Sequence, residues 1–191
     1  EKNMQKSKIK VVDNFLPDDQ FKDISEGMLG NFFPWFWQKH SHGYKLEDGT
    51  FIEDNIPQLT HCFSDDGNIF SEYFKYFENS SLFNKLNTTS ISRFKANCNY
   101  RTSEQTVGWY HTDYTDERKD KLTTSIFYIN TNNGGTKFED DTFVNSVSNR
   151  MVTFDCSLKH APVSCTDSDR RIVININYTK LKDNIKKIDK K

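Results

Sequence analysis

The feature that most constrains the fold is a strict alternation of polar and apolar residues in two stretches of the chain. In the first stretch, polar residues alternate with apolar ones, namely Arg93, Lys95, Asn97 and Asn99 with Phe94, Ala96, Cys98 and Tyr100. In the second stretch, Ile172, Ile174 and Ile176 alternate with Val173, Asn175 and Asn177. Because successive side chains of a strand point to opposite faces of a sheet, this period of two predicts two long β-strands.

The second of these strands begins with two arginines, which the alternation places on opposite faces. Arg170 shares the face of the isoleucines, whereas Arg171 shares the face of Asn175 and Asn177. An all-isoleucine face is expected to pack in a hydrophobic layer, so the mixed face should look into the interior of a barrel. Arg171 is therefore better placed than Arg170 to bind an anionic ligand.

Three other residues have the chemistry of a metal site. His111 and Asp113 are two positions apart, so an extended strand would present their side chains on one face, and His160 supplies a second imidazole. Two histidines and one carboxylate on one side of a metal leave the opposite positions open, as in the facial triad of non-haem Fe(II) oxygenases. Taken singly, each residue has a simpler interpretation: a buried histidine, a turn aspartate, and a loop histidine before Pro162.

Several motifs occur together in a fixed order along the chain. They are Tyr110-His111-Thr112-Asp113, Ile126-Phe127-Tyr128-Ile129-Asn130, Gly134-Gly135-Thr136-Lys137-Phe138, His160, and the strand from Arg171 to Tyr178. This ordered set, over about residues 90–178, resembles the Fe(II)/2-oxoglutarate-dependent dioxygenases, and most closely their prolyl-hydroxylase-like branch. The set is much more specific than an isolated His-x-Asp triplet.

The resemblance implies a fold, a reaction and cofactors. The expected fold is mainly β with supporting α-helices, a double-stranded β-helix or jelly-roll barrel. The expected activity is hydroxylation of a substrate coupled to conversion of 2-oxoglutarate to succinate, with Fe(II), O2 and, as a further requirement to consider, ascorbate. Arg171 and Tyr128 would bind the cosubstrate, together with Asn175 and Asn177, which share the inward face of Arg171.

Two groups of residues are the candidates for substrate binding. The first group is the polar face of a strand, which either lines a water-filled site or is exposed to solvent; it consists of Arg93, Lys95 and Asn97. Trp35 and Trp37 belong to an unusually aromatic run, which forms either part of the core or a wall of the substrate mouth. By resemblance the substrate is a peptide or protein side chain, prolyl above all, while a small molecule such as a free amino acid, and a modified base, remain open.

Two other functions use the same residues. The main alternative is a non-catalytic metal-binding jelly-roll protein, such as a sensor or a binding module. The other is a zinc hydrolase that uses the same three ligands. Turnover of 2-oxoglutarate that depends on Fe(II) distinguishes the oxygenase from both.

The 191 residues suit a single domain spanning 1–191. Its expected parts are a helical support over about 9–88, a catalytic core over about 89–178 and a Lys-rich tail over 179–191. Apolar spacing predicts helices over about 18–29 and 67–78, with a second short helix that contains Leu82 and Leu86.

Composition bears on partners and compartment. The net charge of −1 gives no electrostatic basis for nucleic acid binding. No apolar run approaches the roughly 20 residues of a membrane helix. The four cysteines form no Cys-x-x-Cys pair, so we expect reduced thiols in a cytoplasmic protein. The oligomeric state is not predicted.

Overall fold

The computed structural model describes residues 9–41, 43–45, 48–54 and 56–181. Most of the expected Lys-rich tail therefore lies outside the described residues. The helices are α1 (Asp18–Leu29), α2 (Phe74–Glu78) and α3 (Leu82–Leu86), with a 3-10 helix over Glu117–Asp120. The major sheet contains β1 (Lys10–Val12), β2 (Phe36–Gln38), β5 (Gln58–Asp65), β6 (Asn68–Ile69), β7 (Thr88–Tyr100), β8 (Thr123–Tyr128), β11 (Arg150–Asp155) and β13 (Arg170–Lys180).

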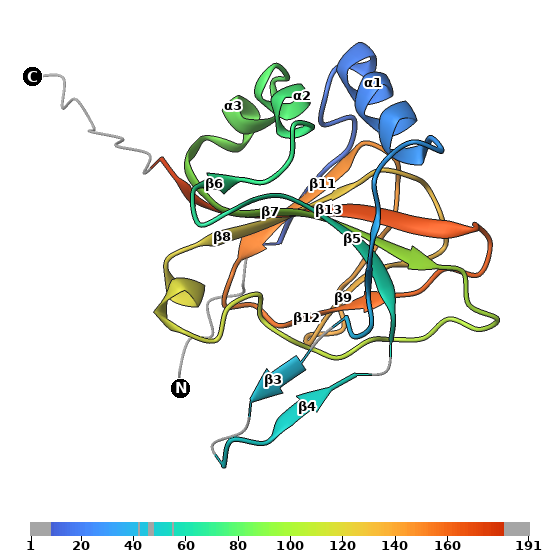
Figure 1. Cartoon of the computed structure of the whole chain (residues 1–191), viewed down its shortest axis with the longest axis vertical. Coiled ribbons are helices and arrows are strands. Elements are labelled where there is room, and N and C mark those ends of the chain that lie inside the picture. Colours follow the sequence, from blue (N-terminus) through green and yellow to red (C-terminus); the bar gives the residue numbers. More distant parts are fainter. Residues whose placement is uncertain (1–8, 42, 46–47, 55, 182–191) are drawn as a thin grey trace, which may run out of the picture.

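All strand pairs of the major sheet are antiparallel, in the order β1-β11-β8-β13-β7-β5-β2, with β6 beside β5. A minor antiparallel sheet consists of β10 (Phe143–Asn145), β9 (Gly135–Phe138) and β12 (His160–Val163), and β3 (Gly43–Lys45) pairs with β4 (Phe51–Glu53) as a separate hairpin. In Figure 1 the helices lie on one side of the major sheet, and β9 and β12 lie on the other. The mainly β architecture with supporting helices is thus as predicted.

The two long strands predicted from the alternation are confirmed as parts of β7 and β13, which pair along their length. Ile172, Ile174 and Ile176 are buried in the core cluster between the major sheet and the helices. Val173, on the opposite face, belongs to a second buried cluster between the two sheets. The structure therefore confirms that the isoleucine face packs in a hydrophobic layer and that the face of Arg171 points inward.

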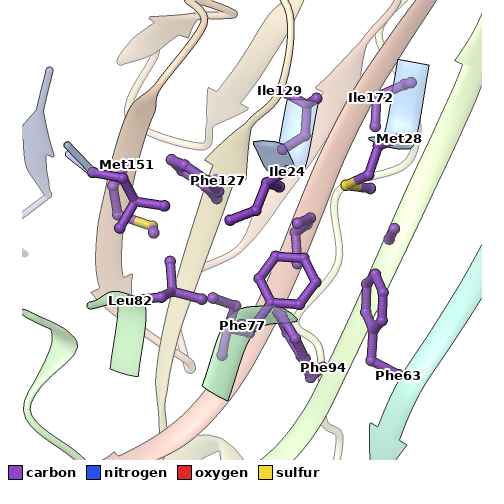
Figure 2. Close-up of a cluster of buried hydrophobic side chains, with 14 of the residues drawn as sticks. Ile24, Met28, Phe63, Phe77, Leu82, Phe94, Phe127, Ile129, Met151 and Ile172 are labelled. Atoms are coloured by element: carbon purple, nitrogen blue, oxygen red, sulfur yellow. The ribbon is translucent and has the colours of Figure 1, made fainter. Parts of the chain in front are cut away.

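Helix α1 has the bounds that the apolar spacing predicts. Its buried residues include Ile24 and Met28, and Figure 2 shows these two side chains among those of Phe127 and Ile172 from the sheet. Pro17 precedes the helix, where its fixed φ and missing N–H suit a helix start. The helix covers the isoleucine face of β13 and excludes water from it.

The helix expected over residues 67–78 is wrong in its first half. Asp66 and Gly67 have φ values of 44° and 79°, a left-handed conformation that reverses the chain. Ile69 then pairs with Ser64, so the segment continues as β6 instead of a helix. The helix begins only at Phe74. Local turn chemistry thus prevailed over an apolar spacing that also fitted a helix.

Three further observations bear on what the sequence led us to expect. The region before residue 88 provides β1, β2 and β5 of the major sheet in addition to the helices. None of the helices in the described part of the chain is long and apolar enough to span a membrane. All four cysteines, which are Cys62, Cys98, Cys156 and Cys165, are free thiols.

Phe94 should be the most sensitive position of the core. Its side chain is fully buried, and its ring centroid lies 4.7 Å from that of Phe63 and 4.8 Å from that of Phe77. We expect Phe94→Ala to lower the free energy of unfolding by about 3–5 kcal/mol in urea titration, because it removes packing and leaves a cavity. The same substitution at Phe32, which is 95% exposed, should change it by less than about 0.5 kcal/mol. Equal losses would contradict this description of the core.

Candidate metal centre and cavity

A backbone pair between the two histidines builds the candidate metal centre. The amide of His111 donates to the carbonyl of His160 over 3.0 Å, and the amide of His160 donates to the carbonyl of His111 over 3.0 Å. These bonds tie the loop that follows β7 to the start of β12. The expected extended strand over His111 and Asp113 is not formed, because His111 makes only an isolated bridge and Asp113 lies in the loop beyond it.

The three predicted ligands nevertheless converge. Oδ1 of Asp113 lies 3.8 Å from Nε2 of His111 and 3.9 Å from Nε2 of His160. One ligand atom from each residue lies within 4.8 Å of the other two. The side chains of His160 and Asp113 are each 3% exposed, and that of His111 is 21% exposed. The group is thus accessible from one side only.

The far nitrogen of each histidine is occupied by a backbone carbonyl. Nδ1 of His111 lies 3.0 Å from the carbonyl oxygen of Trp109, and Nδ1 of His160 lies 3.2 Å from that of Leu158. A proton on Nδ1 makes these contacts hydrogen bonds and leaves the lone pair of each Nε2 directed at Asp113. Neutral imidazoles in this tautomer are the form that binds a metal ion.

The carboxylate of Asp113 is held by three neighbours. Nδ2 of Asn177 donates to its Oδ2 over 2.6 Å, and the hydroxyl of Thr124 donates to the same oxygen over 3.2 Å. Nη2 of Arg93 lies 3.3 Å from Oδ1. Burial by itself would raise the pKa of Asp113, but His160, Arg93, His111 and Asn177 together outweigh it and place the pKa at about 2. The group is ionised at neutral pH, as a metal ligand must be.

The donor set therefore fits a divalent first-row metal ion. Two imidazole nitrogens and one carboxylate oxygen face a common point, and each is oriented by a hydrogen bond on its far side. A bound ion, with bonds of about 2.0–2.2 Å, would draw the three atoms closer together. Three protein ligands leave further coordination positions for small molecules.

Arg171 occupies the other end of the same cavity. It is 2% exposed, and its guanidinium donates weakly to Asn99 Oδ1 and to Thr136 Oγ1, over 3.4 Å each. Its Nε is buried without a hydrogen-bond partner, and no carboxylate of the described residues lies within ion-pair distance of it. A buried cation without an anion is costly, so this end of the cavity is suited to a carboxylate ligand.

Tyr128 and Thr136 complete the surroundings of Arg171. The guanidinium lies 5.7 Å from the centroid of the Tyr128 ring, and the Tyr128 hydroxyl donates to Thr136 over 2.7 Å. Thr136 lies in the Gly-Gly-Thr motif, but its contact with Arg171 was not predicted. Gly134 is required there, since a Cβ atom would lie 2.7 Å from the Val163 carbonyl oxygen and 3.1 Å from Cδ of Arg171.

The triad and Arg171 line one cavity of about 860 Å³ between the sheets. The polar face of β7 also lines it, so the structure selects the wet-site interpretation for Arg93, Lys95 and Asn97. Asn175 lines the cavity too. Asn177 contacts Asp113 rather than Arg171, so the structure places it at the metal end.

A chain of amide side chains across the cavity wall was not predicted. Asn99 donates to Gln58 over 3.4 Å, and Gln58 donates to Gln38 over 3.5 Å. The Nζ of Lys95 donates to the same Gln38 oxygen over 3.1 Å. The residues come from β7, β5 and β2, so only the register of three strands brings them together.

The structure does not bring Trp35 or Trp37 to the cavity, and neither lines it. Trp35 packs against the hydrophobic core, 4.8 Å from Phe33 between ring centroids. Trp37 pairs in register with Leu59, which packs against the same core, while its neighbour Gln38 faces the cavity. Strand alternation thus turns Trp37, which is 62% exposed, to the outer face of the sheet.

Comparison with known proteins identifies the fold through solved structures and not through sequence. No protein-family model matches the sequence, and no curated protein matches it significantly. Solved structures do match. A prolyl hydroxylase from Trichoplax adhaerens, in complex with a hypoxia inducible factor oxygen degradation domain peptide, is 14% identical, with a TM-score of 0.57 over 90% of this chain and 83% of that one.

Two other solved structures have a similar fold. A 2OG-Fe(II) oxygenase family oxidoreductase from Burkholderia pseudomallei is 8% identical, with a TM-score of 0.62 over 90% of this chain and 84% of that one. A viral collagen prolyl hydroxylase from Paramecium Bursaria Chlorella virus-1, in complex with 2OG, is 14% identical, with a TM-score of 0.51 over 91% and 96%. The predicted fold, a double-stranded β-helix like that of the 2-oxoglutarate oxygenases, is confirmed.

Loss of one ligand should abolish tight metal binding. Losing a residue that only orients a metal ligand typically lowers metal affinity roughly 10- to 100-fold. Losing a ligand itself should cost more, so His111→Ala and Asp113→Asn should each weaken Mn(II) binding by more than about 100-fold in anaerobic calorimetry. His40→Ala is the matched control, because His40 pairs with Glu53 and is not part of the triad. Unchanged affinity in folded His111→Ala protein would exclude the triad as the metal site.

Proposed function

We propose that this protein is an Fe(II)- and 2-oxoglutarate-dependent dioxygenase that hydroxylates its substrate. One observation carries the proposal: a converging His-Asp-His triad and a buried arginine without an anionic partner lie at two ends of the same cavity. The triad fits a metal ion, and the arginine fits a carboxylate at the other end of the cavity. 2-Oxoglutarate can bind both, with its 2-oxo acid group at the metal and its other carboxylate at the arginine. The likeness in fold to 2-oxoglutarate oxygenases supports the same proposal.

The triad would hold Fe(II) through Nε2 of each histidine and the carboxylate of Asp113, leaving positions for the cosubstrate and O2. Iron with 2-oxoglutarate supplies oxidative chemistry that yields succinate, CO2 and a hydroxylated substrate. Asn177 and Thr124 fix the orientation of the Asp113 carboxylate. Arg93 keeps that carboxylate ionised before a metal binds.

Arg171 would bind the carboxylate of 2-oxoglutarate that is distant from the metal. Its planar guanidinium can donate two parallel hydrogen bonds to a carboxylate. Thr136 lines the cavity beside it and can supply a further hydroxyl donor, while the Tyr128 hydroxyl donates to Thr136 and holds it in place. Ile126 and Val173 line the cavity and present apolar surface suited to the methylene groups of the cosubstrate.

The proposal extends to substrate, organisation and compartment. We propose a peptide, a protein side chain or a small molecule as substrate, and the peptide complex of the Trichoplax enzyme supports the first of these. Residues 89–178 would form the catalytic core of one domain, to which β1, β2 and β5 contribute strands. The four free thiols fit the reducing, cytoplasmic compartment proposed from the sequence.

Turnover of the cosubstrate tests the function directly. Purified protein is incubated in air with 2-oxoglutarate, ascorbate and either Fe(II), Zn(II) or a chelator, and succinate is quantified. We expect slow succinate formation in the incubation with Fe(II), even without substrate, and none with Zn(II) or with the chelator. A metal-binding sensor would form no succinate, and a zinc hydrolase would need neither Fe(II) nor 2-oxoglutarate. Absence of Fe(II)-dependent succinate from metal-loaded, folded protein would refute the proposal.

The two neighbouring arginines should differ sharply in this assay. Losing a hydrogen-bonded charge partner costs about 2–5 kcal/mol, so Arg171→Ala should raise the 2-oxoglutarate concentration for half-maximal turnover at least about 30-fold while Mn(II) binding survives. Arg170→Ala should leave that concentration unchanged, because the Arg170 side chain bonds to the Leu29 carbonyl on the outer face. The opposite ranking would show that the inner face has been assigned wrongly. Arg171→Lys, which keeps the charge, separates charge loss from misfolding.

A further inference from the structure

Lys95 is a cation on the cavity wall for which the described residues provide no ion-pair partner. It lies on the inner face of β7, between Arg93 and Asn97. Its Nζ donates to a neutral acceptor, Gln38 Oε1, over 3.1 Å. Arg93, its neighbour on the same face, instead pairs with Asp113 over 3.3 Å. On the β7 face of the cavity, Lys95 is therefore the charge that the described fold leaves without a close anion, as Arg171 is on β13.

The electrostatic surroundings of Lys95 agree with this description. Burial lowers the pKa of Lys95, and the charge of Arg93 lowers it further. Asp113 and Asp65 act in the opposite direction, but neither lies within ion-pair distance. Holding a partly buried ammonium beside a guanidinium is unfavourable unless something else in the cavity attracts both.

Two asparagines next to Lys95 also present hydrogen-bond donors. Asn97 precedes Asn99 on β7, and Asn175 is the cross-strand partner of Lys95 on β13. The side-chain oxygens of both asparagines are buried without a donor. Both residues line the cavity, so their amide nitrogens are the polar atoms left to face it. The wall around Lys95 thus presents amide groups, whereas the Lys95 side chain reaches along the wall to Gln38 on β2.

The charges of the proposed metal ion and cosubstrate are balanced by Asp113 and Arg171, without a contribution from Lys95. Fe(II) with the Asp113 carboxylate has a net charge of plus one, dianionic 2-oxoglutarate makes the total minus one, and Arg171 restores neutrality. Arg93 and Lys95 remain, facing the single carboxylate of Asp65. Of the remaining acids of the lining, Asp66 and Asp116 contact Arg118 and Glu53 contacts His40, so none of these three is paired with Lys95.

We propose that Lys95 binds a carboxylate group of the primary substrate. This inference rests on the proposed function and adds the substrate class: an acid, rather than a neutral prolyl side chain alone. A carboxylate accepts hydrogen bonds and carries a negative charge, so it gives the Lys95 ammonium the anionic partner that the described residues do not supply. The carboxylate belongs either to a free or N-acylated amino acid or to an acidic side chain of a peptide.

Binding measured without turnover tests the inference. Protein loaded with Fe(II) and 2-oxoglutarate under nitrogen is titrated by calorimetry with L-amino acids, their N-acetyl derivatives and the primary amide of each. A second series uses end-capped peptides that contain glutamate or glutamine. We expect the compounds that bind to be carboxylates, with each matched amide at least about 30-fold weaker. Binding by free acids identifies a small-molecule substrate, and binding by glutamate peptides alone identifies a peptide.

Variants of the chain locate the effect. Lys95→Met should weaken the acids to the level of their amides, and Lys95→Arg should retain part of the preference. Lys22→Met is the control, since it removes the same charge from an exposed position on α1, and it should retain the preference in full. Substrate-free succinate formation by the unmodified protein separates the two failures: if succinate forms but acids and amides bind equally, this inference fails and the proposed function stands.

Several results would overturn the inference. They are equal binding of acids and amides, absence of binding by every carboxylate, a preference that survives Lys95→Met, and a raised 2-oxoglutarate requirement in that variant. The last would assign Lys95 to the cosubstrate. The binding comparison does not require turnover, so it can be interpreted even if no succinate forms.

Discussion

The pairing of β7 with β13 sets the geometry on which the cavity depends. Its register places Arg171 opposite Asn99, Asn175 opposite Lys95 and Asn177 opposite Arg93. A slip of one residue would turn every one of these side chains to the other face, because side chains alternate along a strand. The isoleucines would then enter the cavity and the arginine would enter the core. Burial of Ile172, Ile174 and Ile176 in the core cluster under the helices therefore also fixes the positions of the polar groups.

The stability of β13 and the positions of the charges in the cavity therefore depend on each other. The outer face of β13 supplies apolar burial, and the inner face holds charges that a fold without ligands leaves poorly compensated. Arg171 and Lys95 are both desolvated, and burial lowers the pKa of each. The packed outer layer stabilises a strand whose inner side is unfavourable by itself, so the protein holds binding groups in place before ligands arrive.

The sequence predicted those parts of the structure that follow from local periodicity. The faces of β13, the choice of Arg171 over Arg170 and the bounds of α1 all came from spacing, and the structure agrees with each. The three metal-ligand candidates converge, although through an isolated bridge at His111 and not through the extended strand that was expected.

What could not be predicted depends on contacts between distant segments. Gln38 and Gln58 carry no local signal, and they reach Lys95 and Asn99 only through the pairing of β2, β5 and β7. Composition alone left open whether Trp37 belongs to the core or to a substrate wall, and strand alternation turns it to the outer face of the sheet. The β6 hairpin was missed because its apolar residues also fit a helical spacing, and the positive φ values at Asp66 and Gly67 decided between the two.

The position of Gln38 at the margin of the sheet has a consequence for the cavity wall. The groups proposed for iron and 2-oxoglutarate lie on β8, β9, β12, β13 and the loop after β7, whereas Gln38 lies on β2, a three-residue strand at the end of the major sheet. Substitutions on such an edge disturb few neighbours and cost little stability. A change at Gln38 therefore alters what holds Lys95 in place without altering the pairing of β7 with β13.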